Sequence, residues 1–279
     1  MHRAINFRLA WLVLAAGLAH PAPPASAADP APVWQDEFDT DGSPDPAKWD
    51  TERGFVRNEE LQWYQPENAV CKGGFLVIEA RREKKPNPDH KPGGTGWKNR
   101  PEIEVTSACL ITKGKREFHY GRFEMRARID TRLGSWPAFW TLGIKNEWPS
   151  NGEIDIMEYY RSMLLANVAW GTGKQWQAKW DDTRTPLEKL GGPDWSKQFH
   201  VWRMDWDEEA IRLSVDDKLL NETLQKDAVN PDGFAPFKQP HYLLLNQAIG
   251  GQSGGDPSKL EYPVRLEVDW VRVYPPVKR

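Results

Sequence analysis

Long hydrophobic runs and an excess of basic residues are both lacking from this 279-residue chain. The longest apolar run, residues 9–18, is too short to span a bilayer as a stable helix, and no other segment is apolar enough. Lysine and arginine number 37 against 40 aspartate and glutamate residues, which gives a formal net charge of −3. We therefore predict no membrane span and no nucleic-acid partner, because phosphate binding requires a basic surface.

Cysteine is nearly absent, since Cys71 and Cys109 are the only two. Each lies in a strand-like segment. If the protein is exported, the two thiols can form a disulfide where their strands are neighbours. Two free, buried thiols fit the sequence equally well.

The first 27 residues have the features of a secretory signal peptide. Arg3 and Arg8 supply the positive start, the apolar run follows, and Ala25-Ser26-Ala27 forms a small-residue cleavage site. No cysteine near that site offers a point for lipid attachment, and an anchor that stays attached is the alternative. We predict a secreted or periplasmic protein in which residues 28–279 form a single domain, with a charge of −5 after loss of the two arginines.

Helical periodicity is scarce, whereas strand-like alternation is frequent. In residues 122–129, apolar and charged side chains alternate strictly, which is typical of a half-buried strand. Further strands are predicted in 75–80, 201–206, 211–215, 242–248 and 267–274. Loops are predicted in 84–100, 171–194 and 225–240, and one helical turn in 194–199. Many short strands joined by long loops, without an internal linker or repeat, predict a β-sandwich.

Three carboxylates are grouped in the segment GEIDIMEY, which also has the apolar residues of a strand. Glu153 and Asp155 are two residues apart and share a face of the strand. Glu158 is three residues further on and would point the other way in a regular strand. One extra residue, a β-bulge near Ile156 or Met157, returns it to the same face.

A row of acids on one surface is the arrangement that retaining cleavage of a glycosidic bond requires. One carboxylate acts as the nucleophile, and a second carboxyl group about 5–5.5 Å away acts first as an acid and then as a base. A concave sheet would bring Glu153 and Glu158 toward each other, and Asp155 between them would help to hold their pKa values apart. A solvated acidic face or a metal site are the alternatives.

Tryptophan-rich segments surround the three acids and carry a family resemblance. The run WPAFWTLG precedes WPSNGEIDIMEY, and further matching segments are WQDEF at 34–38, NEELQWY at 58–64, YGRFEMRA at 120–127, LNQAIGG at 245–251 and VDWVRVY at 268–274. Together they resemble glycoside hydrolase family 16 in its laminarinase- and agarase-like form, with the bulged E-x-D-x-x-E motif. The resemblance covers nearly all of residues 28–279.

The resemblance implies an all-β fold and a division of labour among the three acids. The fold would be a jelly-roll β-sandwich of two curved antiparallel sheets with an open concave cleft. Glu153 would be the nucleophile, Glu158 the acid and base, and Asp155 the assisting acid. Catalysis by this mechanism uses no metal or other cofactor.

The resemblance also implies which residues bind sugar. Trp136 and Trp140 match a pair that lines the sugar site before the scissile bond, and Phe139 between them is expected in the core. Asn58 matches a sugar-binding asparagine, with a turn-capping role as its alternative. Trp148 and Asn246 are further cleft candidates.

A structural calcium site is implied on the convex side of the sandwich. Glu37 and Asp269 match two ligands that many relatives use together with a backbone carbonyl. Oxygen ligands of this kind suit Ca²⁺. Ordinary hydrogen bonding is the alternative.

One position departs from the laminarinase pattern. Laminarinase-like relatives commonly have a histidine where this chain has Ala169, and Trp170 follows. We expect Trp170 on the cleft floor, where it would change how a product-side sugar lies. The long loop at 84–100, and Arg184 with Lys179, could reshape the cleft or meet acidic groups of a substrate.

These residues together predict a secreted, monomeric, retaining endo-β-glycanase whose partner is a polysaccharide. The first expectation for the substrate is a β-1,3- or mixed β-1,3/1,4-linked glucan. An endo-β-galactanase that acts on agar-like or host-glycan β-galactosides is the alternative. A non-catalytic carbohydrate-binding module and a transglycosylase are two further alternatives for the function.

Overall fold

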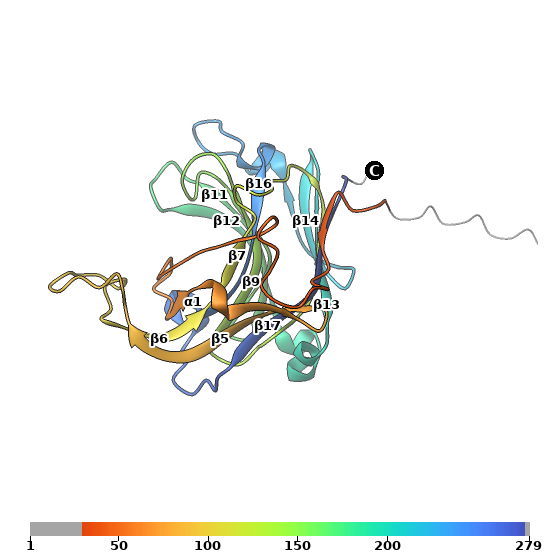
Figure 1. The fold of residues 1–279 in the computed structure, drawn as a ribbon. Helices are drawn as coiled ribbons and strands as arrows, with labels where there is room; N and C mark the ends of the chain where they lie inside the picture. The colour runs from red at the N-terminus through yellow and green to blue at the C-terminus, as the bar shows by residue number, and fades with distance from the viewer. Residues whose placement is uncertain (1–29, 277–279) are drawn as a thin grey trace, which may run out of the picture. The chain divides into compact units, whose positions relative to one another are not determined.

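Two large β-sheets lie face to face in the computed structural model (Figure 1), which describes residues 30–276. The expected jelly-roll sandwich is confirmed. Among the described helices, none is long and apolar enough to cross a membrane. The predicted signal peptide, residues 1–27, lies outside the described residues.

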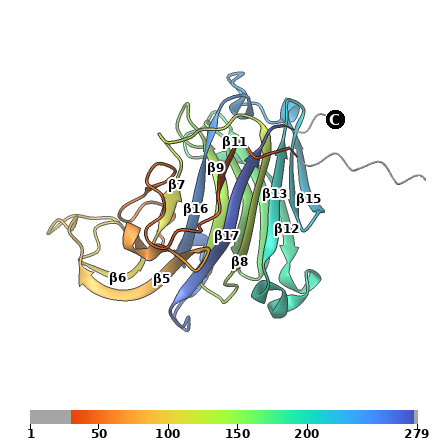
Figure 2. The same cartoon turned by 45° about the vertical axis from the view of Figure 1, so that its right-hand side comes forward.

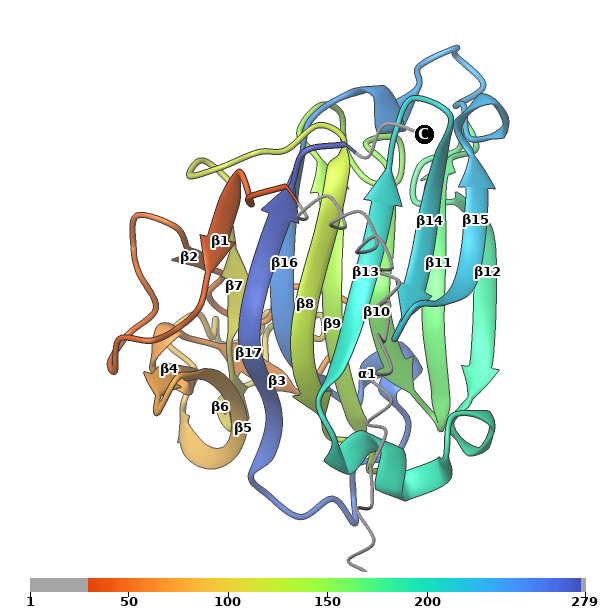
Figure 3. The ribbon, with the colours of Figure 1, turned by 90° about the vertical axis from the view of Figure 1, so that its right-hand side faces the viewer.

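The first sheet has ten strands and forms the face seen in Figure 3. Its order is β15-β14-β13-β8-β17-β5-β6-β3, while β1 pairs with β17 and β4 with β5. Along the chain the strands are β1 Trp34–Asp36, β3 Gln62–Tyr64, β4 Ala69–Lys72, β5 Phe75–Pro86, β6 Glu102–Ser107, β8 Gly121–Ile129, β13 His200–Trp206, β14 Ala210–Val215, β15 Lys218–Leu224 and β17 Val264–Tyr274. All pairs are antiparallel except β3 with β6. At one edge, β5 and β6 bend away from β17 (Figure 2).

The second sheet has seven antiparallel strands in the order β12-β11-β10-β9-β16-β7-β2. They are β2 Asp50–Thr51, β7 Cys109–Ile111, β9 Ser135–Gly143, β10 Glu153–Tyr160, β11 Met163–Gly171, β12 Ala178–Pro186 and β16 His241–Ile249. In the described residues, helical structure is limited to α1 Gly251–Gly254 and five 3₁₀ turns, at Pro66–Asn68, Leu187–Lys189, Gly192–Lys197, Gln225–Asp227 and Pro236–Lys238. The turn at Gly192–Lys197 corresponds to the helical turn expected in 194–199.

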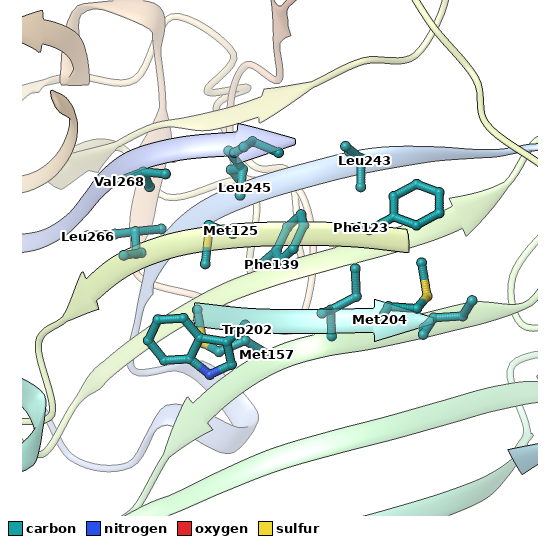
Figure 4. Close-up of a cluster of buried hydrophobic side chains, with 14 of the residues drawn as sticks. Phe123, Met125, Phe139, Met157, Trp202, Met204, Leu243, Leu245, Leu266 and Val268 are labelled. Carbon is teal, nitrogen blue, oxygen red and sulfur yellow. The ribbon is translucent and has the colours of Figure 1, made fainter. Parts of the chain in front are cut away.

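The hydrophobic core fills the space between the two sheets (Figure 4). It follows from the strand alternation, because one face of each strand is apolar. Phe123 and Met125 on β8 and Trp202 on β13 come from the first sheet, and Phe139 on β9 and Met157 on β10 come from the second. These side chains are at most 1% exposed. The core placement expected for Phe139 is confirmed.

Truncation of Phe139 tests how far the sandwich depends on this core. We expect Phe139→Ala to lower the free energy of unfolding by about 3–5 kcal/mol, because it removes a fully buried ring and leaves a cavity. The measurement is urea denaturation followed by tryptophan fluorescence. Leu219→Ala, at a side chain that is 56% exposed, is the matched control and should change the value by less than about 0.5 kcal/mol. Equal losses in the two variants would contradict this assignment of the core.

Two expectations about local structure differ from what the structure shows. The predicted loop 171–194 contains β12, an edge strand with polar residues on both faces and therefore no apolar alternation. The strand expected at 75–80 continues to Pro86, so the loop after it starts later than predicted. The two cysteines lie in different sheets, Cys71 on β4 and Cys109 on β7, and both are free and buried.

Candidate active site

The three predicted acids lie on β10, and a β-bulge brings them to one face. Asp155 lies opposite Trp140 on β9, but the next pair is Met157 with Phe139, so Ile156 is the extra residue. The pairing with β11 shifts over the same stretch. Ile156 and Met157 are fully buried in the core. The predicted bulge is confirmed, and its apolar residues anchor the acid row from behind.

Glu153 and Glu158 open into a cleft of about 560 Å³ on the outer face of the second sheet. It spans the sheet from the segment before β3 to the edge strand β12. Its walls combine aromatic rings with polar groups. The lining residues are Arg57, Asn58, Trp136, Trp140, Leu142, Trp148, Glu153, Glu158, Tyr160, Asn167, Trp176, Trp180, Asp182, Arg184 and Ser253.

Glu153 is held by hydrogen bonds that favour its charged form. The indole N–H of Trp148 donates to its Oε2 at 2.6 Å, and Asp155 shares a second hydrogen bond with it. Burial raises the pKa of Glu153, whereas these two hydrogen bonds and the nearby charge of Arg57 lower it. Burial is the larger influence, so the pKa of Glu153 is raised, and the hydrogen bonds and the charge of Arg57 limit that rise.

Glu158 has surroundings that favour a bound proton. Burial raises its pKa to about 8; a hydrogen bond from Trp136 opposes this, and the negative charge of Glu153 adds to it. The Trp136 indole N–H donates to Oε1 of Glu158 at 2.7 Å. A carboxyl group that stays protonated at neutral pH can act as a general acid.

Asp155 lies between these two groups and is 4% exposed. Burial and the charges of Glu153 and Glu158 raise its pKa well above the ordinary range. The raised pKa favours the neutral acid, which can donate a hydrogen bond to Glu153. The Asn167 amide approaches Asp155 Oδ2 and Glu158 Oε2, each at 3.5 Å, so β11 ties the second and third acids together.

The sugar-binding candidates divide into cleft residues and supporting residues. Trp136, Trp148 and the exposed Asn58 line the cleft as expected. Trp140 also lines it, but the guanidinium of Arg57 lies over its ring at 5.1 Å. Asn246 is buried and does not line the cleft.

Asn246 supports Trp140 from beneath. Its Oδ1 accepts the Trp140 indole N–H at 2.7 Å, and its amide donates to the Tyr64 hydroxyl at 3.2 Å. Tyr64 in turn donates to the buried carboxylate of Glu60 at 3.2 Å. The expectation that Asn246 contacts sugar directly is therefore wrong, and its role in the structure is to orient Trp140.

The expectation that Trp170 lies on the cleft floor is also wrong. Glu153 pairs with Ala169 across β10 and β11, so Ala169 shares its face and Trp170 points the other way. Trp170 is 4% exposed and belongs to the hydrophobic core. Lys179 lies over the Trp170 ring at 5.0 Å and does not line the cleft, whereas Arg184 does.

Each of the two predicted calcium ligands forms an ion pair with an arginine. Both carboxylate oxygens of Glu37 accept from Arg272, at 2.8 and 2.7 Å, and Asp269 pairs with Arg126. Within residues 30–276, no group of three or more His, Cys, Asp or Glu side chains is placed to hold a metal ion. Each carboxylate is paired with a guanidinium, and the calcium prediction is not confirmed.

Several cleft residues were not among the sequence candidates. Trp180 and Asp182 are two of them, and together with the expected Arg184 they alternate along β12 and face the cleft. Trp176, in the loop before that strand, stacks on Trp148 with ring centroids 6.5 Å apart. The spacing of two between residues 180, 182 and 184 could have indicated a strand, but the polar composition of this segment is equally typical of a loop.

Comparison with known proteins agrees with this geometry. The model of glycosyl hydrolases family 16 matches residues 64–272. The chain belongs to this family. It is a glycoside hydrolase, with the acid row of β10 at the centre of its cleft.

Three proteins with similar sequences or structures illustrate the relationship of this chain to the family. It is 40% identical to the β-glucanase of Rhodothermus marinus over 261 residues, which cover 87% of this chain and 84% of that protein. A solved structure reported with endo-acting O-glycanases, which prominent members of the human gut microbiota express to initiate mucin breakdown, superposes with a TM-score of 0.80. That pair is 33% identical and covers 91% of this chain and 94% of the other. The keratan-sulfate endo-1,4-β-galactosidase of Sphingobacterium multivorum is 28% identical over 87% of this chain and 54% of its own length.

Replacement of Trp148 tests the electrostatics around Glu153. We expect Trp148→Phe to move the acidic limb of the kcat/KM profile to higher pH by about one to two units. The lost N–H stabilised the carboxylate by about 1.5–3 kcal/mol, so the pKa of Glu153 rises and a higher pH is needed to ionise it. The measurement is kcat/KM against pH. Trp176→Phe is the control, because it changes the stacking partner without touching Glu153, and an unshifted limb in Trp148→Phe would refute the role of this hydrogen bond.

Proposed function

We propose that the chain is an endo-acting β-glycanase that hydrolyses a β-1,3- or mixed β-1,3/1,4-linked glucan with retention of configuration. The observation that carries the proposal is the acid row in a cleft that crosses the sheet. Its two cleft-facing members differ in their surroundings: hydrogen bonds and the charge of Arg57 oppose the rise that burial gives the pKa of Glu153, whereas the pKa of Glu158 is raised to about 8. The similarity to a β-glucanase over most of both chains supports a glucan as the substrate.

In the first step, the Glu153 carboxylate attacks the anomeric carbon and forms a glycosyl ester. Glu158 gives its proton to the glycosidic oxygen, the bond to that oxygen breaks, and the leaving chain departs as an alcohol. In the second step, Glu158, now a carboxylate, takes a proton from water while the water oxygen attacks the same carbon. The ester bond breaks and Glu153 returns as a carboxylate. The raised pKa of Asp155 favours its protonated form, and its hydrogen bond limits the basicity of Glu153.

The aromatic walls supply binding and orientation. Trp136, Trp148, Trp176 and Trp180 present ring faces or indole edges along the cleft. Such surfaces suit the apolar faces of sugar rings. Both ends of the cleft carry polar groups, Asn58 at one and Asp182 with Arg184 at the other, which suits a bound chain that continues in both directions.

A product profile tests the proposal. Purified residues 28–279 are incubated with laminarin, mixed-linkage β-glucan, agarose, carrageenan and a galactose-rich mucin glycan, and the released oligosaccharides are sized. A ladder from laminarin or mixed-linkage glucan, with intermediate sizes early in the reaction, is the expected result. Release of single sugars only, or no cleavage of either glucan, would contradict it.

An endo-β-galactosidase is the second candidate, and a specific observation favours it. Ala169 lies opposite Glu153 where laminarinase-like members have histidine, and Trp180 lies opposite Ala169 on β12 and lines the cleft. A small residue beside a large ring gives the product side a different shape. The relatives reported with mucin breakdown and keratan sulfate support this alternative. Cleavage of only the galactose-containing polymers would establish it.

We also propose that the protein is exported and acts as a monomer. The support is the leader-like sequence of residues 1–27 and the location of the whole acid row and cleft within one chain. N-terminal sequencing of the protein recovered from the medium or periplasm, together with light scattering, tests both points. A start before Ala28 or a dimeric mass would contradict them.

A further inference from the structure

A second hollow lies outside the catalytic cleft and is larger, at about 760 Å³. It is formed by residues 53–55, Trp63 on β3 and the loop between β5 and β6, which projects from the sheet in Figure 1. The hollow and the cleft have no lining residue in common. The proposed hydrolysis assigns no role to it.

Two asparagines hold the projecting loop in shape. Asn87 is 5% exposed, and its amide donates to the carbonyl oxygens of Lys98 and Arg100 at 3.3 and 2.7 Å. The Asn99 amide donates to the carbonyls of Lys91 and Gly94 at 2.9 and 2.7 Å, and its Oδ1 accepts the Lys91 N–H. The hollow is therefore built by specific internal hydrogen bonds, and a ligand does not have to order it.

Three aromatic rings form one wall of the hollow. The buried Phe55 lies edge-to-face with Trp63 at 5.4 Å and with Trp97 at 6.4 Å between centroids. Trp63 and Trp97 are each partly exposed, and neither indole N–H donates to another described residue. A ring face with a free donor at its edge is a suitable surface for a sugar ring and its hydroxyl groups.

The rim of the hollow is basic, although the chain as a whole is acidic. Arg53, Lys91 and Lys98 are exposed, and none of them forms an ion pair within the described part of the chain. Lys98 instead lies over the Trp97 ring at 5.2 Å. Asp89 is the one acidic residue in the lining. Charge complementarity therefore favours a ligand with negative groups.

The hollow is fastened to the segment that carries Asn58 in the catalytic cleft. Arg100, at the end of the loop, donates to the carbonyls of Leu61 and Glu59 at 3.3 and 3.1 Å. Its guanidinium also lies over the Phe55 ring at 4.6 Å. A polymer bound in the hollow would stay close to the cleft, and its local concentration there would rise.

We propose that this hollow is a second saccharide-binding site, which takes a polysaccharide segment bearing sulfate or carboxylate groups. The aromatic wall receives sugar rings, and Arg53, Lys91 and Lys98 meet the anionic substituents. The site retains a charged polymer beside the cleft and takes no part in bond cleavage. This inference goes beyond the proposed hydrolysis and does not depend on which polymer is cut.

The test measures binding by the Glu153→Gln protein in native gels that contain κ-carrageenan or laminarin. We expect stronger retardation by κ-carrageenan, and at least a tenfold loss of that affinity in Lys91→Ser/Lys98→Ser and in Trp97→Ala. Lys115→Ser/Lys226→Ser, at two exposed lysines elsewhere, is the matched control and should bind as before. In the otherwise wild-type protein, the loop substitutions should leave hydrolysis of a short oligosaccharide substrate within twofold.

Each other outcome overturns the proposal or part of it. Binding by the lysine variant equal to that of the control would show that the rim does not meet the polymer. Loss in Trp97→Ala alone would show a site for neutral sugar and overturn the anionic assignment. The lysine variant keeps the aromatic wall, so it remains informative if Trp97→Ala unfolds. A loss of oligosaccharide hydrolysis in the loop variants would instead give the hollow a role in catalysis. Failure of the proposed function would be recognised separately, because the wild-type protein itself would then not hydrolyse the substrate.

Discussion

Glu153→Gln is expected to lower kcat by about four orders of magnitude or more while leaving the fold unchanged. The amide cannot form the glycosyl ester, so the two-step route is closed. Glutamine has the shape of glutamate, and its carbonyl oxygen can still accept the indole N–H of Trp148. The residual rate reflects only binding and the remaining acid. The measurement is steady-state hydrolysis of the best polymer from the product profile, with an assay sensitive enough for the residual rate.

The control for this variant is an acid close by in sequence but outside the cleft. Glu147 is exposed, does not line the cleft, and lies six residues before Glu153. Glu147→Gln should hydrolyse the polymer at the wild-type rate. The melting temperatures of the two variants should agree within a few degrees. Activity near the wild-type level in Glu153→Gln would remove this residue from the role of nucleophile.

The acid row could be predicted from sequence because its information is local. Spacing of two puts Glu153 and Asp155 on one face, and Glu158 joins them only through a bulge. The apolar residues at the bulge indicate which face is buried. The strands of the core were predictable for the same reason, since alternation of apolar and polar residues encodes a half-buried strand.

The positions of Trp170 and β12 could not be predicted in this way. Trp170 follows Ala169, and only the register between β10 and β11 decides which of the two faces the cleft. Register depends on pairing between distant segments, and a shift of one residue exchanges the faces. Strand β12 has polar side chains on both faces because one face lines the cleft and the other contacts β15 through Asp181 and Thr223.

The convex side shows the same dependence on distant contacts. Arg272 is 235 residues from Glu37 in sequence, and Arg126 is 143 residues from Asp269. Nothing in the local sequence around either acid indicates these partners. A family pattern identified the two carboxylates as metal ligands, whereas the tertiary structure gives each of them a guanidinium.

Glu158→Gln is expected to remove the acid and base of the reaction. The fall of kcat/KM at alkaline pH should disappear with it. In the wild type, kcat/KM should fall as pH rises through about 8, because burial raises the pKa of Glu158 to that value and the proton needed by the leaving group is lost above it. The limb reports the coupled acids as a group, since Glu153 and Asp155 interact with Glu158. The variant should lose about two to four orders of magnitude in kcat/KM on a polymer.

The choice of leaving group separates loss of the acid from general damage. The leaving group of an activated aryl glycoside departs without a proton, so Glu158→Gln should form the glycosyl-enzyme at close to the wild-type rate. The intermediate should then accumulate, because no base activates water.

The stability of the protein gives an independent readout with a definite sign. A carboxyl group whose pKa is raised in the folded state costs stability as pH rises from its ordinary value toward about 8, and the amide does not titrate. The variant should therefore lose less stability than the wild type between pH 5 and pH 8. The difference in free energy of unfolding should be roughly that of a pKa shift of those few units. A polymer profile that still falls near pH 8 in Glu158→Gln would assign the acid to another residue.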